Sequence, residues 1–376
     1  MIMNSVSYKR ATNIALTTNQ VGSLIMQKIP ARKKLLFFIT LITTSFVAFA
    51  QSASSAEVKM EGSEGTTLTG KVMATFDQPW AMTFLPDGHS LVTEKEGVIW
   101  LLDKNQQKRF SVENVPDVTA RGQGGLGDVI IHPEFATNKT VYVSYVERDP
   151  QDDAFSGAVI ERATLNITNN SASLSDREII WRQSPKVTGN GHYSHRMVFS
   201  PDGYLFITSG ERQKFTPAQN MAMNLGKILR LNDDGSVPED NPFVGNGDVT
   251  GQIWTLGHRN PLGIDFDAEG NLWAHEMGPR HGDELNIIER GRNYGYPMVS
   301  QGDHYSGTKI PNHEDFPIFK APEKAWVPAI SPAGFIIYKG SKFSDWTGNG
   351  FIGGLSSKAL VRVTFEKDDK GAWQVE

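Results

Sequence analysis

The stretches Phe84-Leu85-Pro86-Asp87-Gly88, Phe199-Ser200-Pro201-Asp202-Gly203 and Phe266-Asp267-Ala268-Glu269-Gly270 repeat one pattern. In each, a phenylalanine is followed three residues later by an acidic residue and four residues later by a glycine. A β-type run begins within two residues of each glycine: Ser90–Glu94, Tyr204–Thr208 and Asn271–Ala274. The glycine supplies the positive φ that a tight turn needs, and a preceding proline fixes φ at the turn's entrance. Each stretch therefore predicts a strand, a tight turn and a second strand.

Weaker copies of this pattern extend over most of the chain. Val129–Phe135 precedes the run Val141–Tyr145, and Phe335–Tyr338 is a further strand-like run. A β-sandwich would be far smaller than the roughly 326 residues that follow position 50. Irregularly spaced hairpin repeats over this length favour an all-β fold, a β-propeller, whose radial blades protect their edges and leave an axial funnel for a ligand.

One segment has a helical pattern. Ala218–Leu231 carries apolar residues at helical spacing, and we expect a helix with its methionines in the core. Asn232–Pro238 then predicts a turn. Its residues Asp233 and Asp234 lack the further ligands of a calcium loop, so we interpret them as solvated.

The N-terminal region predicts export. Arg32-Lys33-Lys34 precedes the apolar run Leu35–Ala50, which ends in Ala48-Phe49-Ala50, as in a signal peptide with its cleavage site. The run is short for a membrane span, and a membrane anchor is the alternative reading. We therefore assign residues 1–50 to a signal peptide with an upstream extension, with Met26 as a candidate for the true start, and residues 51–376 to the propeller. The protein is expected in the periplasm or outside the cell, with no stable membrane span after processing.

Charge and cysteine content exclude some functions. Residues 1–50 hold six Lys or Arg and no acid, so their removal takes the formal charge from −5 to −11. So acidic a body is not expected to bind nucleic acid. With 0 Cys, disulfides and thiolate chemistry are excluded, and stability must come from core burial, a metal or both.

Two loops have the composition of a built site. Leu256–Pro261 places a permanent cation beside an amide, and Met277–Glu284 combines a Gly-Pro bend with two adjacent carboxylates. Carbonyl and carboxylate oxygens are ligands that hard cations prefer. Each loop follows a short apolar run, Ile253–Thr255 or Leu272–Ala274, so we place both at strand ends, where a rigid scaffold presents functional groups.

The chain resembles the soluble PQQ-dependent glucose and aldose sugar dehydrogenases. The resemblance spans about Pro79 to Arg362 and rests on long motifs: Gly226–Asn232, Asp234–Pro238, Asp240–Phe243, Leu256–Gly263 and Gly291–Pro297. It implies a six-bladed propeller that holds pyrroloquinoline quinone (PQQ) and Ca²⁺ in its axial funnel. An aldose would be the substrate, and an external acceptor would take the electrons.

The resemblance also implies roles for individual residues. His192 resembles the catalytic base, a task that suits imidazole because its pKa lies near neutrality; His195 is a rival three residues on. Gln123 resembles the glutamine that contacts the sugar. Arg259 and Asn260 resemble the pair that binds the quinone, where a fixed cation stabilises the charge that develops as hydride arrives.

The same resemblance implies metal sites. Gly278 and Pro279 resemble the carbonyl ligands of the cofactor's calcium, and Asp283 and Glu284 resemble acidic residues of a second, structural calcium site. Oxygen ligands suit Ca²⁺, and a chain without cysteine disfavours soft metals.

Two departures from the family pattern concern the cofactor's cations. Gly354–Lys358 reads Gly-Leu-Ser-Ser-Lys, so the expected lysine is absent or displaced by two residues. The family's Arg-x-Arg-Asp segment, expected beyond Val363, has no counterpart before Glu376, and the last blade is expected to be incomplete. Each lost charge-assisted hydrogen bond would weaken PQQ binding by about 1.5–3 kcal/mol.

The leading hypothesis is an exported quinoprotein that oxidises the anomeric hydroxyl of aldoses to lactones. One alternative is a non-catalytic propeller that binds a carbohydrate or a protein at the funnel mouth. Another is a calcium-dependent propeller lactonase, which would use clustered carboxylates around a metal instead of an Arg-Asn loop.

Overall fold

The computed structural model describes residues 57–106, 109–169 and 171–376. Their strands, in chain order, are β1 (Glu57–Glu61), β2 (Thr67–Lys71), β3 (Pro79–Phe84), β4 (Ser90–Glu94), β5 (Val98–Leu102), β6 (Arg109–Glu113), β7 (Leu126–Ile131), β8 (Thr140–Arg148), β9 (Phe155–Ile167), β10 (Ala172–Arg182), β11 (Val187–Thr188), β12 (Ser194–Phe199), β13 (Leu205–Ser209), β14 (Lys227–Leu231), β15 (Ile253–Leu256), β16 (Pro261–Phe266), β17 (Leu272–Glu276), β18 (Asp283–Ile287), β19 (Lys324–Trp326), β20 (Pro332–Ile337), β21 (Gly350–Gly354), β22 (Ala359–Val363), β23 (Phe365–Lys367) and β24 (Trp373–Val375). The helices are short: α1 (Phe135–Asn138), α2 (Asp248–Gly251) and the 3₁₀ turns η1 (Thr216–Gln219), η2 (His313–Asp315) and η3 (Ser344–Trp346).

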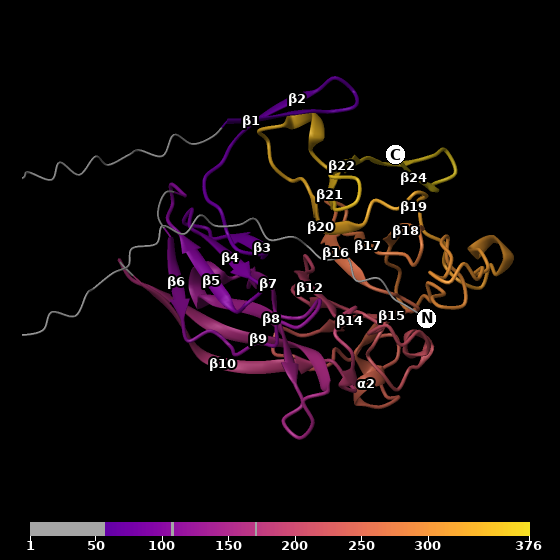
Figure 1. Ribbon diagram of the computed structural model, residues 1–376, viewed down its shortest axis with the longest axis horizontal. Coiled ribbons are helices and arrows are strands. Elements are labelled where there is room, and N and C mark those ends of the chain that lie inside the picture. Colours follow the sequence, from indigo (N-terminus) through magenta and orange to yellow (C-terminus); the bar gives the residue numbers. More distant parts are fainter. Residues whose placement is uncertain (1–56, 107–108, 170) are drawn as a thin grey trace, which may run out of the picture. The chain divides into compact units, whose positions relative to one another are not determined.

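The strands form successive antiparallel blades, which follow one another in chain order (Figure 1). β3–β6 and β7–β10 are two four-stranded blades whose last strands, β6 and β10, join them into one sheet by a short parallel pairing, and β11 pairs with β9. β12–β15 and β16–β19 are separate four-stranded blades, and β20–β22 form a three-stranded blade. The first strands of consecutive blades contact each other in the order β3, β7, β12, β16, β20, so they line a common axis. The predicted all-β propeller is confirmed, and the described residues form five of the six expected blades.

The repeated turns behave as the sequence predicts. Gly88, Gly203 and Gly270 have φ of 94°, 90° and 85°. Each glycine N–H donates to the carbonyl three residues back, which closes the turns between β3 and β4, β12 and β13, and β16 and β17. The same local signal thus builds the innermost hairpin of three different blades.

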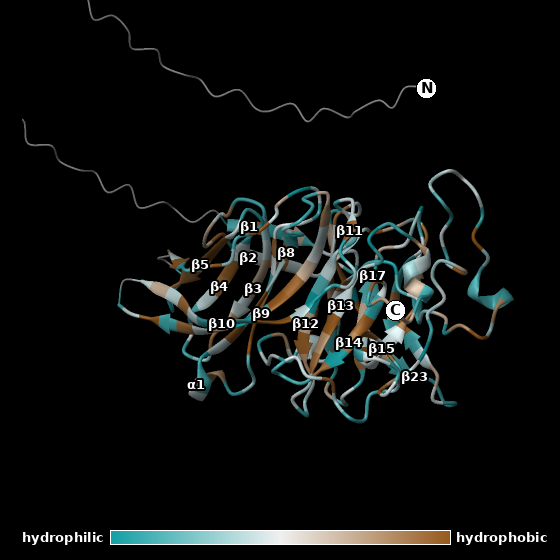
Figure 2. Cartoon of the chain, turned by 90° about the horizontal axis from the view of Figure 1, so that it is seen from below, coloured by the Kyte–Doolittle hydropathy of each residue, from teal (hydrophilic) through white to brown (hydrophobic). Residues whose placement is uncertain are grey.

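The apolar core lies between neighbouring blades. One cluster joins the first two blades around Leu101 and Val143, a second joins the next pair around Tyr142 and Ile207, and a third around Ile228 and Ile264 follows. Figure 2 shows hydrophobic residues concentrated on the strands and hydrophilic residues in the connecting loops. Burial of both sheet faces fixes the position of each strand end, and with it the loops that follow.

The predicted helix over Ala218–Leu231 is wrong. The segment instead contains the end of η1, an irregular stretch and β14, with Gly226 at a φ of 69° between them. All five residues of β14 are buried, so the strand shows no alternation of buried and exposed residues, and its apolar residues Ile228 and Leu229 fit helical spacing as well. Lys227 is buried in this strand although its side chain is polar, because its Nζ donates to the carbonyls of Pro217, Ala218 and Leu225 at 2.7, 3.1 and 2.7 Å.

Two hairpins, β1–β2 and β23–β24, stand outside these blades in the pairing scheme. Residues around Asn232 form the predicted turn, since Gly235 N donates to Asn232 O at 3.0 Å.

The predicted signal peptide, residues 1–50, lies outside the described residues. Within the described ranges, none of the helices has the length and apolarity of a membrane-crossing segment.

Candidate active site

The loops singled out in the sequence emerge at one end of the blades. In an antiparallel blade the start of the first strand, the end of the second, the start of the third and the end of the fourth share an edge. Ser194 pairs with Ser209, Lys227 with Leu256, and Pro261 with Glu276 at this edge. The topology therefore brings the segments before β12, after β13, between β15 and β16, and after β17 to the same side.

His192 precedes β12 and forms a buried pair with Glu211, which follows β13. His192 Nδ1 lies 2.5 Å from Glu211 Oε1. The two residues are 7% and 0% exposed. Glu211 also accepts hydrogen bonds from the backbone N–H groups of Gln213, Lys214 and Phe215 at 2.9, 2.5 and 2.6 Å, so its carboxylate is fixed on both oxygens.

The electrostatics make His192 a proton acceptor. Burial lowers the pKa of His192; its hydrogen bond with Glu211 offsets part of this effect, and the charge of Arg259 adds to the lowering. Burial raises the pKa of Glu211, but the hydrogen bond and charge of His192, the backbone N–H of Phe215 and the charge of Arg259 together outweigh it, and the net shift is downward. At neutral pH the pair is a carboxylate and a neutral imidazole, in which Nδ1–H donates to Glu211 and Nε2 carries the lone pair.

His195, the rival base, is packed into the core. It is 2% exposed, its Nδ1 lies 2.7 Å from Ser144 Oγ, and its ring stacks on Trp80 with centroids 5.0 Å apart. Gly127 makes room for it: a Cβ at that position would lie 2.0 Å from the imidazole Cε1. Burial lowers the pKa of His195 to about 3. A residue so enclosed has no access to a substrate.

Gln123 lies beside the histidine. Its Oε1 accepts a hydrogen bond from the His192 backbone N–H at 2.7 Å, and its own N–H donates to Asn190 O at 2.8 Å. Gln123 is exposed, so the predicted sugar-contacting residue stands at the open side of the base.

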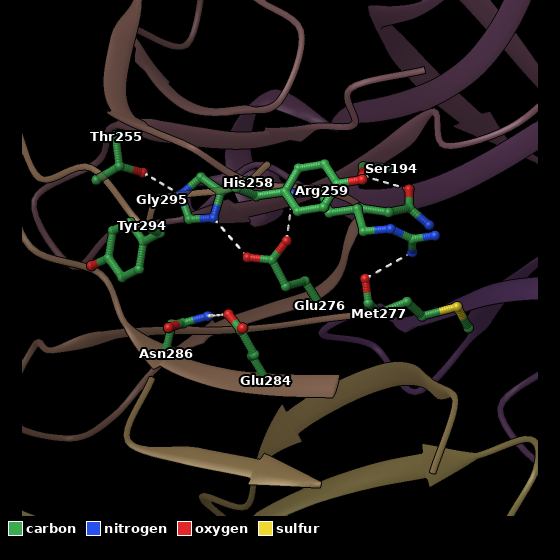
Figure 3. A network of polar contacts seen from close by, with 12 residues as sticks. Ser194, Thr255, His258, Arg259, Glu276, Met277, Glu284, Asn286, Tyr294 and Gly295 are labelled. Atoms are coloured by element: carbon green, nitrogen blue, oxygen red, sulfur yellow. Dashed lines mark hydrogen bonds and ion pairs between the residues drawn. The ribbon is translucent and has the colours of Figure 1, made fainter. Parts of the chain in front are cut away.

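A second His–Glu pair supports the Arg259 loop (Figure 3). His258 Nδ1 lies 2.9 Å from Glu276 Oε1, and His258 Nε2 lies 2.9 Å from Thr255 Oγ1. The other oxygen of Glu276 accepts from Arg259 N at 2.5 Å. This network fixes the backbone of the cation that follows.

The Arg259 guanidinium is buried without a counter-ion. Arg259 is 6% exposed, its Nη1 donates to Met277 O at 3.0 Å, and its Nε has no hydrogen-bond partner among the residues that the structure describes. It forms no ion pair with any carboxylate of the described part of the chain. A buried cation with an unused donor favours an anionic partner, since unpaired buried charge is costly.

Asn260 ties the two loops together. Its Oδ1 accepts a hydrogen bond from Ser194 Oγ at 3.0 Å, two residues from His192. Glu211 N donates to Arg259 O at 2.9 Å. The structure therefore brings His192, Gln123, Arg259 and Asn260 into one connected site.

Three of the four predicted metal ligands, Gly278, Pro279 and Glu284, line a small cavity. The cavity measures about 10 Å³, and Glu276 and Arg259 also line it. Within the described residues, no donor bonds the carbonyl of Gly278 or Pro279. Asp283 is occupied otherwise, because its two oxygens accept from Gly278 N at 3.0 Å and Ser331 N at 2.7 Å.

Asp283 and Glu284 do not share one environment. They are consecutive in β18, so their side chains project to opposite faces of the blade. Burial raises the pKa of Glu284 well above its usual range, and the neighbouring Glu276 adds to the effect. In the described part of the chain, no three His, Cys, Asp or Glu side chains gather closely enough to hold a metal.

The sequence reasoning missed Glu211 and Glu276. Glu276 is the last residue of β17, and Glu211 lies two residues beyond the end of β13. The signal that could have found them is an acidic residue at the end of a strand that follows a Pro-Asp-Gly type turn, at the same edge as the histidines.

The fold and this site define a β-propeller enzyme that sets a proton-accepting histidine beside a buried cation. The glucose/sorbosone dehydrogenase family model matches residues 76–375. Aldose sugar dehydrogenase YliI of Escherichia coli (strain K12) is 37% identical over 298 residues, 78% of this chain and 79% of that protein.

Solved structures agree with this match. The apo form of the soluble aldose sugar dehydrogenase from Escherichia coli superposes with a TM-score of 0.74 at 36% identity, covering 80% of this chain and 85% of that one. The PQQ-bound aldose sugar dehydrogenase from Streptomyces coelicolor gives 0.65 at 27% identity, with 80% and 82% covered. The chain belongs to the glucose/sorbosone dehydrogenase family, and it is an oxidoreductase that acts on sugars.

Proposed function

We propose that the protein oxidises the anomeric hydroxyl of an aldose to the lactone, with PQQ as its cofactor and an external acceptor for the electrons. The observation that carries the proposal is the buried Arg259 guanidinium, which has an unused Nε and no carboxylate partner among the described residues, beside a His192 whose pKa burial lowers and whose Nδ1 Glu211 binds. The name of the relative from Escherichia coli and the PQQ-bound relative from Streptomyces coelicolor support it.

The residues present fit the cofactor. PQQ is a tricarboxylate, and Arg259 offers a desolvated cation with a free donor for such an anion. Asn260 is fixed next to it by Ser194. When bound, PQQ supplies the acceptor for the two electrons and the hydrogen that leave the sugar as hydride.

The chain's own residues handle the proton and the charge. As the C–H bond at the anomeric carbon breaks and its C=O bond forms, His192 Nε2 accepts the hydroxyl proton. A positioned general base such as His192 contributes about 10²–10⁴-fold to the rate. Glu211 keeps Nδ1 protonated and stabilises the imidazolium that forms. The fixed charge of Arg259 favours the reduced, more negative product state of the acceptor, and Gln123 offers its amide to the sugar.

We also propose that Ca²⁺ binds at the carbonyls of Gly278 and Pro279. Gly278 and Pro279 both line the small cavity, and no donor of the described residues bonds their carbonyls. Glu276 and Glu284 line the same cavity and offer carboxyl oxygens to a cation there. Carbonyl and carboxylate oxygens form the coordination shell that Ca²⁺ prefers.

Export to the periplasm or the medium is part of the proposal. It is supported by the basic segment Arg32–Lys34 and the apolar run Leu35–Ala50. Mass spectrometry of the exported protein should give an N-terminus near Gln51. An intact Leu35–Ala50 segment on the purified protein would refute cleavage.

The function is tested by adding PQQ and Ca²⁺ to purified protein and following dye-linked oxidation of a panel of aldoses. The variant Arg259→Met, which keeps the apolar stem, should lose both PQQ retention and turnover. Arg292→Met is the matched control, because Arg292 is a half-exposed surface residue paired with Glu289. Protein that binds PQQ and oxidises no aldose would overturn the proposed reaction.

A further inference from the structure

Arg212 is a buried cation next to the base pair. It directly follows Glu211 and is 1% exposed. Burial lowers its pKa to about 10, which still leaves it charged at neutral pH. It forms no ion pair with any Asp or Glu of the described ranges.

Backbone carbonyls take the place of a counter-ion. The guanidinium donates to Gly191 O at 3.0 Å, to Gly189 O at 2.6 Å and to Ser156 O at 2.6 Å. Its Cζ also lies 3.7 Å from the centre of the Tyr193 ring. Gly189, Gly191 and Tyr193 lie on both sides of His192 in the sequence. The Arg212 side chain therefore contacts the loop of the base both before and after the histidine.

That loop is in a conformation that needs support. His192, Ser194 and His195 have φ of 50°, 59° and 61°, and Arg212 itself has 63°. Left-handed backbone at a non-glycine residue costs on the order of 1 kcal/mol and persists where surrounding contacts enforce it. The two strained segments also touch directly, because Arg212 N donates to His192 O at 3.2 Å.

The neighbouring glycine shows how closely the segments approach. A Cβ at Gly210 would lie 2.1 Å from the carbonyl oxygen of His192. The base loop is therefore pressed between the strand end at Ser209–Glu211 and the five donors of one planar side chain. A lysine at position 212 could not reach the same set of carbonyls, since its ammonium is a single point donor.

We propose that Arg212 is the positioning residue of the catalytic base: its guanidinium, bound by the carbonyls of the 189–193 loop, holds His192 in its reactive geometry. The inference rests on the proposed function for the role of His192. It predicts that one substitution of Arg212 can change the geometry of the loop and keep the charge beside the imidazole, whereas another removes both.

Two variants make the separation. Arg212→Gln removes both the charge and the fork of donors, whereas Arg212→Lys keeps the charge and loses the fork. Both should lower kcat by about 10²-fold, because displacement of a catalytic group by about 1 Å costs that much, and both should change KM less than kcat. PQQ should stay bound, because Arg259 is untouched.

The pH–rate profile distinguishes a positioning role from a merely structural one. The groups that face His192 are Glu211 and Arg212 after β13 and Arg259 before β16, and the two arginines lower its pKa. Loss of the Arg212 charge should therefore raise the pKa of His192 and move the acid limb of kcat to higher pH in Arg212→Gln. In Arg212→Lys the limb should stay near that of the native protein.

Arg230→Gln is the matched control. Arg230 lies in the same blade, is 5% exposed, and its guanidinium also packs 3.7 Å from a tyrosine ring, that of Tyr204. Its guanidinium bonds Asp240 and Asn241 instead of the loop of the base. It should lower the melting temperature like Arg212→Gln and leave kcat and the acid limb unchanged. Hydrogen exchange of the apo proteins gives a readout without cofactor: amides of residues 189–195 should exchange faster in both Arg212 variants and not in Arg230→Gln.

The possible failures are distinguishable. A native protein that binds PQQ and oxidises no aldose defeats the proposed function, and the exchange experiment still reports on the loop. If the native protein is active and Arg212→Lys keeps native kcat and native exchange of residues 189–195, the inference is overturned, even where Arg212→Gln does not fold.

Discussion

The described residues contain two buried His–Glu pairs at the same end of adjacent blades, and these pairs differ in the bonding and the exposure of the imidazole. In His258–Glu276 both imidazole nitrogens are bonded, to Glu276 and to Thr255 at 2.9 Å each, and the ring stacks on Tyr294. In His192–Glu211 only Nδ1 has a bonded partner among the described residues, and the histidine reaches solvent with 7% of its surface against 1% for His258. The same pair of residues thus serves as scaffold where both nitrogens are bonded and can act as a base where one is free.

The largest expected effect comes from the same substitution made in each pair. His192→Gln should lower kcat for aldose oxidation by about 10²–10⁴-fold, since it removes the proton acceptor. Its melting temperature and bound PQQ absorbance should stay near native values, because Arg259 and the scaffold pair remain. Near-native turnover in His192→Gln would show that another group is the base.

Glu211→Gln tests whether the carboxylate acts through the histidine. It should lower kcat by about 10²-fold, because a neutral amide orients and stabilises the imidazolium less well. Glu211 raises the pKa of His192 through its hydrogen bond and charge. Its neutralisation should therefore lower that pKa and move the acid limb of the pH–rate profile to lower pH, opposite in direction to Arg212→Gln.

A limb that moves upward in Glu211→Gln would contradict this electrostatic account. Glu161→Gln is a suitable control, because Glu161 is a buried carboxylate paired with Arg177 in the second blade. It should change stability without moving the limb.

His258→Gln should behave in the opposite way to His192→Gln. Loss of the imidazole leaves Glu276 without one of its donors, and a buried polar group left unsatisfied costs about 1–3 kcal/mol. We expect the free energy of unfolding, measured by urea titration, to fall by that amount. Once folded, the variant should keep the acid limb of the native protein, since His192 and its neighbours are unchanged; a displaced limb would place His258 in the proton path.

The sequence could predict the loops of the site but not the pairs within it. Turn signals such as Pro86–Gly88 set hairpins locally, so the fold and the strand ends followed from short stretches. The partners of the histidines come from segments 19 and 18 residues away, and their meeting depends on the register of β12 with β13 and of β16 with β17. That register is set by packing between blades, which no local pattern encodes.

The error over Ala218–Leu231 has the same origin. A strand buried on both faces shows no alternation, and spacing alone cannot separate it from a buried helix. The sequence likewise could not predict Arg212 as the positioning residue, because its hydrogen-bond partners are backbone carbonyls, which every residue type carries.

The smallest expected effect concerns the small cavity that Glu276 and Glu284 line. Calcium at 100 times its Kd should stabilise the EDTA-treated apo protein by about 2.7 kcal/mol if it binds the native state alone, seen as a rise in melting temperature. Glu284→Gln should reduce the rise, because Glu284 lines the cavity together with Gly278 and Pro279. Asp283→Asn should mainly lower the melting temperature without calcium, because both Asp283 oxygens hold backbone N–H groups. Glu289→Gln, a change at the surface pair with Lys320, is the control that should do neither. An apo protein whose unfolding ignores millimolar calcium would remove the metal from the site and leave Glu284 as a buried carboxyl that the scaffold tolerates.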